Sequence, residues 1–138
     1  MSEKYLLDTS ALMSLLTDEE GADDVASILR RAELGAVEVY ASFMTYMETF
    51  YRVWRIAGEE AAKSTYAELK EMPIHRIDLS EPILFRAGSI KSNYRLSVAD
   101  AWIIASAIQM EASLVHKDPE FEQVQNMVSL ITLPYKSR

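Results

Sequence analysis

Short apolar segments alternate with segments of helical spacing along nearly the whole chain, and this alternation restricts the fold more than any other feature. The apolar runs of strand length fall at 4–7, 37–41, 73–77, 113–116 and 127–133. Strands that alternate with helices are typical of a parallel sheet whose two faces are both covered by helices. The expected fold class is therefore α/β.

The segments between these strands carry the start and stop signals of helices. Thr17-Asp18-Glu19-Glu20 matches a capping box, so we expect a helix to begin there, and Gly35 stands where that helix would end. The segment 98–110 is apolar on nearly every side, which predicts a central, enclosed helix. Further helices are expected over 9–16, 43–57 and 59–72, and from Ser80 onward.

The overall composition limits the class of protein. A chain of 138 residues with 49% hydrophobic residues is expected to form one domain, 1–138. The absence of cysteine excludes disulfides and thiolate metal sites. No apolar run approaches a membrane span and no leader is apparent, so we expect a cytoplasmic protein without membrane contact. The net charge of −7 argues against broad electrostatic binding of nucleic acid, although a metal bound among clustered acids would change the local field.

Four carboxylates stand where a strand ends or a helix begins. Asp8 ends the first apolar run, Asp118 follows a later one, and Glu48 and Asp100 lie in helical segments. Ligands bind at the carboxyl ends of strands in open α/β sheets. Carboxylates without thiols suit Mg²⁺ or Mn²⁺, and two such ions would favour phosphodiester hydrolysis.

Each of these acids also has a structural explanation. Asp8 would cap the first helix, and Asp118 precedes a proline as an N-cap often does. Glu48 and Asp100 each stand three residues after a threonine or serine, as in a capping box. Against this, both lie in strongly apolar segments, where an unpaired carboxylate is costly unless it is solvated or binds a cation.

The order and spacing of the acidic motifs resemble those of a known family. Leu7-Asp8-Thr9-Ser10-Ala11-Leu12, a mid-helix Glu48, the run from Asp100 to Ala107 and Lys117-Asp118-Pro119-Glu120-Phe121 together resemble the PIN domain family over essentially the whole chain. At this length the chain looks most like the VapC-type toxins of toxin–antitoxin pairs. The resemblance implies a three-layer α/β/α sandwich around a mostly parallel sheet of about five strands.

The same resemblance implies an activity, a site and partners. It implies a divalent-metal-dependent endoribonuclease in which Asp8, Asp100 and Asp118 bind Mg²⁺ or Mn²⁺. Glu48 would complete the site or orient the attacking water, and the Ser10 hydroxyl would contribute. The implied partners are an RNA substrate, a second copy in a homodimer, and an antitoxin lying over the 43–57 helix.

One position departs from the family pattern. Many members have threonine where this chain has His116, which is expected to be a surface or strand-end histidine and not a ligand, as is His75. In the 43–57 helix, Tyr46, Tyr51 and Trp54 either form an apolar groove for the antitoxin or belong to the core.

Three other classes of function can be compared with the sequence. A metal-dependent phosphatase of the haloacid dehalogenase type also begins with an acid after the first strand, but it needs a second Asp where this chain has Ser10. A receiver domain needs an acidic pair beside Asp8, and none is present. The non-enzymatic alternative is an inactive α/β interaction module whose carboxylates act only as caps.

Overall fold

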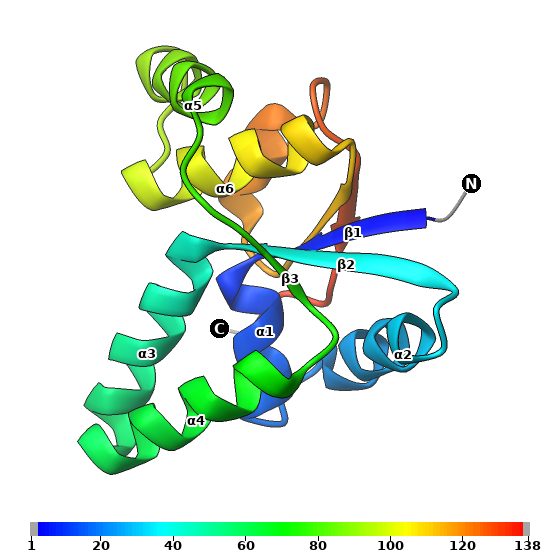
Figure 1. Ribbon diagram of the computed structural model, residues 1–138. Coiled ribbons are helices and arrows are strands. Elements are labelled where there is room, and N and C mark those ends of the chain that lie inside the picture. The colour runs from blue at the N-terminus through cyan, green and yellow to red at the C-terminus, as the bar shows by residue number, and fades with distance from the viewer. Residues whose placement is uncertain (1–2, 137–138) are drawn as a thin grey trace.

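The computed structural model describes residues 3–136 and contains a five-stranded sheet in which all neighbouring strands are parallel (Figure 1). The strand order is β3-β2-β1-β4-β5. The strands are β1 (Glu3–Leu7), β2 (Val37–Ser42), β3 (His75–Ile77), β4 (Ser113–His116) and β5 (Leu130–Thr132). The order reverses between β1 and β4, which is where open α/β sheets bind ligands. The predicted fold class is confirmed.

Helices cover both faces of the sheet. They are α1 (Thr9–Leu16), α2 (Ala22–Glu33), α3 (Phe43–Ala57), α4 (Glu59–Glu71), α5 (Glu81–Asn93), α6 (Val98–Met110) and the 3₁₀ helix η1 (Pro119–Val124). In Figure 1, α5 and α6 lie on one side of the sheet, and α1, α2 and α4 lie on the other. Within residues 3–136, no helix has the length and apolar character needed to cross a membrane.

Two apolar cores result from the alternation of side chains along the strands. Leu6 of β1 and Leu114 of β4 pack toward α5, α6 and η1, whereas Leu7 and Val115 pack toward α1 and α2. The predicted enclosure of α6 is confirmed, because its residues from Ile103 to Ala107 are buried. Since α6 is fixed on its apolar sides, its first turn is held firmly above the carboxyl ends of the strands.

The capping box expected at Thr17 does not form. The Thr17 hydroxyl donates instead to the carbonyl of Met13 at 2.7 Å, and Thr17 ends α1. Helix α2 begins at Ala22, after Gly21 with φ 98° and no side-chain cap. A Cβ on Gly21 would lie 3.2 Å from Leu133, so both backbone and packing favour glycine here. The turn is therefore used to close α1 and not to open α2.

The apolar residues Phe43, Met47, Phe50 and Trp54 recur at helical spacing, which predicts that they form the buried face of α3. This prediction is wrong for Met47 and Trp54. The helix starts at Phe43, capped by the Ser42 hydroxyl, which accepts from the Met44 amide at 3.1 Å. Thr45, Tyr46 and Thr49 are its buried residues, while Met47 is 50% and Trp54 44% exposed. The prediction missed this because α4 covers the Tyr46 side of α3. The rings of Tyr46 and Phe50 contact Tyr66 of α4, with centroids 6.3 and 6.4 Å away.

Candidate metal centre

Asp8 leaves the central strand β1 and caps α1. Its Oδ2 accepts hydrogen bonds from the Ser10 amide at 3.0 Å and from the Ser10 hydroxyl. Its own amide donates to the carbonyl of Val115 at 2.9 Å, so the residue is tied to β4 as well. The predicted cap is present, and yet the side chain is only 4% exposed.

Burial raises the pKa of Asp8 from 3.8 to about 6. The hydrogen bonds from Ser10 oppose this increase, and the nearby charge of Glu48 adds to it. A helix cap on the surface keeps its carboxylate solvated and needs no such shift. Asp8 is therefore a cap held in surroundings that favour either a proton or a cation.

Ser10 links Asp8 to the end of β4. Its hydroxyl donates to Asp8 and accepts from the amide of Lys117 at 2.9 Å. Because one hydroxyl serves both partners, the ends of β1 and β4 are held at a fixed separation. Ser10 thus positions Asp8 through a hydrogen-bond chain.

Asp100 lies in the first turn of α6. Its amide donates to the hydroxyl of the N-cap Ser97 at 3.1 Å, so the predicted helix start is confirmed. Burial raises the pKa of Asp100 from 3.8 to about 7, with further contributions from the charges of Asp8 and Asp118. Glu48 contributes to the same shift. The four predicted acids therefore act on one another electrostatically.

Asp118 follows β4 and caps η1, where it meets an acid that the sequence analysis did not select. Its Oδ1 accepts from the Glu120 amide at 3.0 Å. Carboxylate oxygens of Asp100, Asp118 and Glu120 all lie within 4.8 Å of one another. The missed signal was an acid two residues after Asp118, in the first turn of a helix that starts with proline.

Glu48 lies in the second turn of α3, so it is not part of a capping box. Its Oε1 accepts from the Thr9 hydroxyl at 2.7 Å, and that hydroxyl also lies 3.2 Å from the Thr45 hydroxyl. The Glu48 side chain is half-buried, and neither Glu48 nor Asp8 belongs to the group of Asp100, Asp118 and Glu120, whose carboxylate oxygens lie within 4.8 Å of one another. Glu48 is thus fixed beside that group by the residue following Asp8.

His116 ends β4, as predicted, but it is completely buried and not on the surface. Its Nδ1 accepts from the Asp118 amide at 3.1 Å, so Nε2 carries the proton and faces the Thr132 hydroxyl at 3.1 Å. Burial lowers the pKa of His116, which keeps the ring neutral. Both ring nitrogens are occupied, and His116 therefore orients the Asp118 backbone without being available to a metal.

The donor set fits a hard divalent cation. All candidate ligand atoms are carboxylate oxygens, and within residues 3–136 none of these acids forms a salt bridge with a basic side chain. Clustered carboxylates without a basic partner repel one another, which accounts for part of the raised pKa of Asp100. Oxygen ligands of this kind suit Mg²⁺ or Mn²⁺ better than zinc.

Comparison with known proteins agrees with this geometry. A family model described as the PIN domain matches residues 5–127. A search of curated proteins by sequence returns no match.

Several solved structures share the fold. One is VapBC from Salmonella typhimurium bound to DNA, with 15% identity, a TM-score of 0.75, and coverage of 94% of this chain and 98% of that one. VapBC2 from Rickettsia felis, bound to a DNA fragment from its promoter, shows 18% identity, a TM-score of 0.72 and the same coverage. VapC20 from Mycobacterium tuberculosis, described as a toxin that cleaves the sarcin–ricin loop, shows 17% identity, a TM-score of 0.68, and coverage of 87% and 94%.

Proposed function

Because the chain belongs to the PIN domain family, we propose that it is a divalent-metal-dependent endoribonuclease and the toxin of a toxin–antitoxin pair. The observation that supports this most strongly is the convergence of acids at the carboxyl ends of β1 and β4. Two of them, Asp8 and Asp100, have pKa values raised to about 6 and about 7 by burial. Strongly shifted acids in such a place are typical of functional sites.

In this proposal Asp8, Asp100 and Asp118 bind Mg²⁺ or Mn²⁺, together with Glu120. A bound ion would supply activation of water and neutralisation of the scissile phosphate. The chain's own residues set the geometry. Ser10 donates two hydrogen bonds to one oxygen of Asp8 and so fixes the orientation of this carboxylate.

Glu48 has a different role in the proposal. The hydrogen bond from Thr9, the residue after Asp8, holds the Glu48 carboxylate where its charge acts on Asp8, outside the group formed by Asp100, Asp118 and Glu120. A carboxylate at this position is suited to accept a hydrogen bond from the attacking water and to orient it toward the phosphate. Thr9 is then a positioning residue for Glu48.

The partner proposed for this protein is an antitoxin, and a homodimer is proposed as its assembly. Among the structures with the same fold, one from Klebsiella pneumoniae is described as a toxin–antitoxin complex, and VapBC-5 from Mycobacterium tuberculosis is described as a member of the VapBC family of toxin–antitoxin systems. On this chain, Met47 and Trp54 lie seven residues apart on one side of α3, and both are exposed. Tyr46 is buried against α4 and is not part of that surface. It therefore does not form the predicted apolar groove with Tyr51 and Trp54.

The test is cleavage of purified total RNA with Mg²⁺, with Mn²⁺ and with EDTA. We expect discrete cleavage products only when a divalent ion is present. Asp100→Asn should abolish the products while leaving the far-ultraviolet circular dichroism spectrum unchanged. If no ion supports cleavage and none raises the melting temperature, the inactive interaction module is the correct assignment.

A further inference from the structure

A pocket opens beside the proposed metal centre and has residues in common with its surroundings. Its volume is about 250 Å³, which is smaller than sites for drug-sized ligands and suits one unit of a polymer. Ser10, whose hydroxyl donates to Asp8, and Pro119, which follows Asp118, both line it. An extended chain with one phosphate at the carboxylates would therefore place a neighbouring unit in this pocket.

The pocket is basic, in contrast to the chain as a whole. Three basic side chains and one acidic side chain line it, although the net charge of the protein is −7. Lys117 and Lys136 both pair with the acidic residue, Glu19, at 3.5 and 3.3 Å. Lys117 also donates to the carbonyl of Glu20 at 2.7 Å. These two ammonium groups make the pocket positive, but their charges are already partly compensated.

Arg52 is the third basic residue, and it differs from the other two. It lies on α3 four residues after Glu48, and four residues is the spacing that places two side chains on the same helix face. It is half-buried, and within residues 3–136 it forms no salt bridge. A guanidinium has planar, paired donors that match the oxygens of a phosphate. Arg52 is thus the group available to bind an anion in the pocket.

An aromatic ring completes the lining. Tyr135 is half-buried, and its hydroxyl donates to Glu122 at 3.0 Å, which holds the ring in place. Basic side chains beside an aromatic ring are the combination with which proteins bind single-stranded nucleic acid, because the ring stacks on a base while the cations contact phosphate.

We infer that this pocket binds one nucleotide of the RNA next to the scissile phosphate, with Arg52 on a phosphate and Tyr135 against the base. The inference rests on the proposed nuclease function and specifies where its substrate lies. An acidic peptide would satisfy the basic groups as well. A nucleotide is favoured because the pocket adjoins the carboxylate site at Ser10 and Pro119, and because the aromatic ring has no role in binding a carboxylate.

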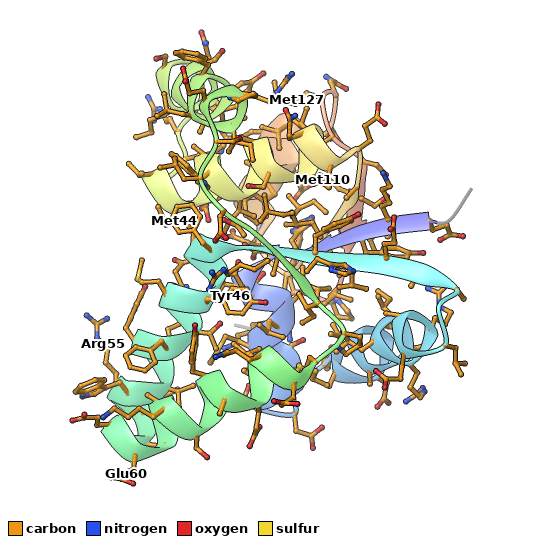
Figure 2. The ribbon with its side chains drawn as sticks, viewed as in Figure 1. Met44, Tyr46, Arg55, Glu60, Met110 and Met127 are labelled. Carbon is orange, nitrogen blue, oxygen red and sulfur yellow. The ribbon has the colours of Figure 1, made fainter. Side chains whose placement is uncertain are left out.

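The first experiment measures binding in Mg²⁺ with a labelled single-stranded RNA of random sequence, in an Asp100→Asn background that prevents cleavage. Arg52→Gln should weaken binding about tenfold. It should also reduce the slope of log Kd against log salt by about 0.7, because one phosphate contact is lost. Arg55→Gln is the matched control, since it removes the same charge from the same helix. Arg55 is exposed, does not line the pocket, and lies over the Tyr51 ring at 4.9 Å (Figure 2).

The second experiment uses the otherwise wild-type enzyme. Arg52→Gln should raise KM about tenfold with little change in kcat. Arg52→Lys should have a KM between those of the wild-type enzyme and Arg52→Gln. Tyr135→Leu should weaken RNA binding about fivefold, whereas Tyr135→Phe, which keeps the ring, should not. If Arg52→Gln lowers the melting temperature, Lys136→Gln at an exposed position serves in its place, with a smaller change in salt dependence because Glu19 partly compensates the Lys136 charge.

The outcomes separate the two proposals. If the wild-type protein cleaves no RNA, the nuclease proposal fails and the nucleotide pocket fails with it. If it cleaves RNA but Arg52→Gln and Arg55→Gln have the same KM and salt slope, only the pocket is overturned. If Arg52→Gln loses equal affinity for RNA and for a polyglutamate peptide, the pocket binds acidic peptide and the nucleotide assignment is wrong.

Discussion

The two ends of the parallel sheet both have acidic side chains, but they differ in how these are surrounded. At the amino-terminal end of the strands, Glu3 and Glu111 line a hollow of about 450 Å³, and both are exposed. At the carboxyl end, Asp8 is buried and Asp100 is half-buried. The hollow at the amino-terminal end therefore has solvated acids, whereas the acids at the carboxyl end are withdrawn from solvent.

The difference follows from how the chain leaves the strands. Strand β1 passes into α1 with Asp8 as the cap, and β4 is followed within three residues by η1. Such tight turns keep acidic caps close to the core, so their charges repel one another in a poorly solvated space. Acids that are solvated need no cation, whereas acids that are buried together do. The burial of the acids is consequently a better guide to the chemistry of this molecule than the size of a cavity.

The largest expected effect is the loss of catalysis on changing one buried acid. Asp100→Asn should reduce the rate of Mg²⁺-dependent RNA cleavage at least about 1000-fold, or about 4 kcal/mol in activation free energy. Glu111→Gln, at the other end of the sheet, should leave the rate unchanged. Single-turnover cleavage at pH 8 measures both. Equal losses in the two variants would remove the functional distinction between the two ends.

The next effect concerns the metal-free protein and its dependence on pH. Asp8 and Asp100 have folded-state pKa values of about 6 and about 7, above the ordinary value of 3.8. The folded state therefore binds more protons than the unfolded state between these values, and stability should fall as pH rises from about 4 to about 7. It should change little above pH 8.

Substitutions of Asp8 and Asp100 test this predicted dependence of stability on pH. Asp8→Asn or Asp100→Asn should raise the free energy of unfolding at pH 8 in EDTA by roughly 2 kcal/mol and flatten the pH profile. Asparagine caps a helix about as well as aspartate, so the first turn of α1 should survive. Urea unfolding at pH 5 and pH 8 gives both quantities. A lower stability of the variants at pH 8 would instead favour a purely capping role for these acids.

A smaller effect is expected at Glu120, the acid that only the structure places at the site. Glu120→Gln should weaken Mg²⁺ binding about tenfold, because one of three adjacent carboxylates loses its charge. The matched control is Glu122→Gln in the same short helix, which should bind Mg²⁺ normally. The midpoint of the rise in melting temperature with Mg²⁺ measures affinity. The same midpoint in both variants would exclude Glu120 from the site.

The smallest effect is expected at Thr9. Thr9→Val keeps the shape of the side chain but removes the hydrogen bond to Glu48, which is worth about 1 kcal/mol. Cleavage should slow about fivefold with Mg²⁺ affinity unchanged, and Thr9→Ser should restore the rate. Reduced Mg²⁺ affinity in Thr9→Val would show that Glu48 binds the ion itself and does not only orient water.

Much of the fold could be predicted because the strongest local signals agree with the tertiary structure. The run 113–116 is a buried strand, the apolar segment 98–110 is an enclosed helix, and Gly35 has φ 77° directly after α2. The failures occur where two local signals compete. Thr17 and Thr45 both begin a plausible capping box, but Thr17 bonds back to α1, and Ser42 caps α3 before Thr45 is reached.

The site could be predicted only in part, since contacts across the sheet decide the rest. The positions of Asp8 and Asp100 follow from strand and helix ends near them in sequence. His116 is buried because Phe121 and Tyr135, from later segments, place their rings 5.2 and 6.3 Å from it. Glu120 joins Asp100 only because η1 and the first turn of α6 meet in space. Local patterns contain no information about either meeting.

The hydrogen bond between Ser10 and Lys117 has a consequence for the order of events during synthesis. It joins residues 107 positions apart, at the ends of two strands that pair in the finished sheet. A ribosome releases the amino-terminal segment first, so a growing chain presents Asp8 and Glu48 long before β4 exists to hold β1 on its other side. Contacts of such long range also form late. The acidic site as described, whatever its activity, is therefore complete only when almost the whole chain has been made.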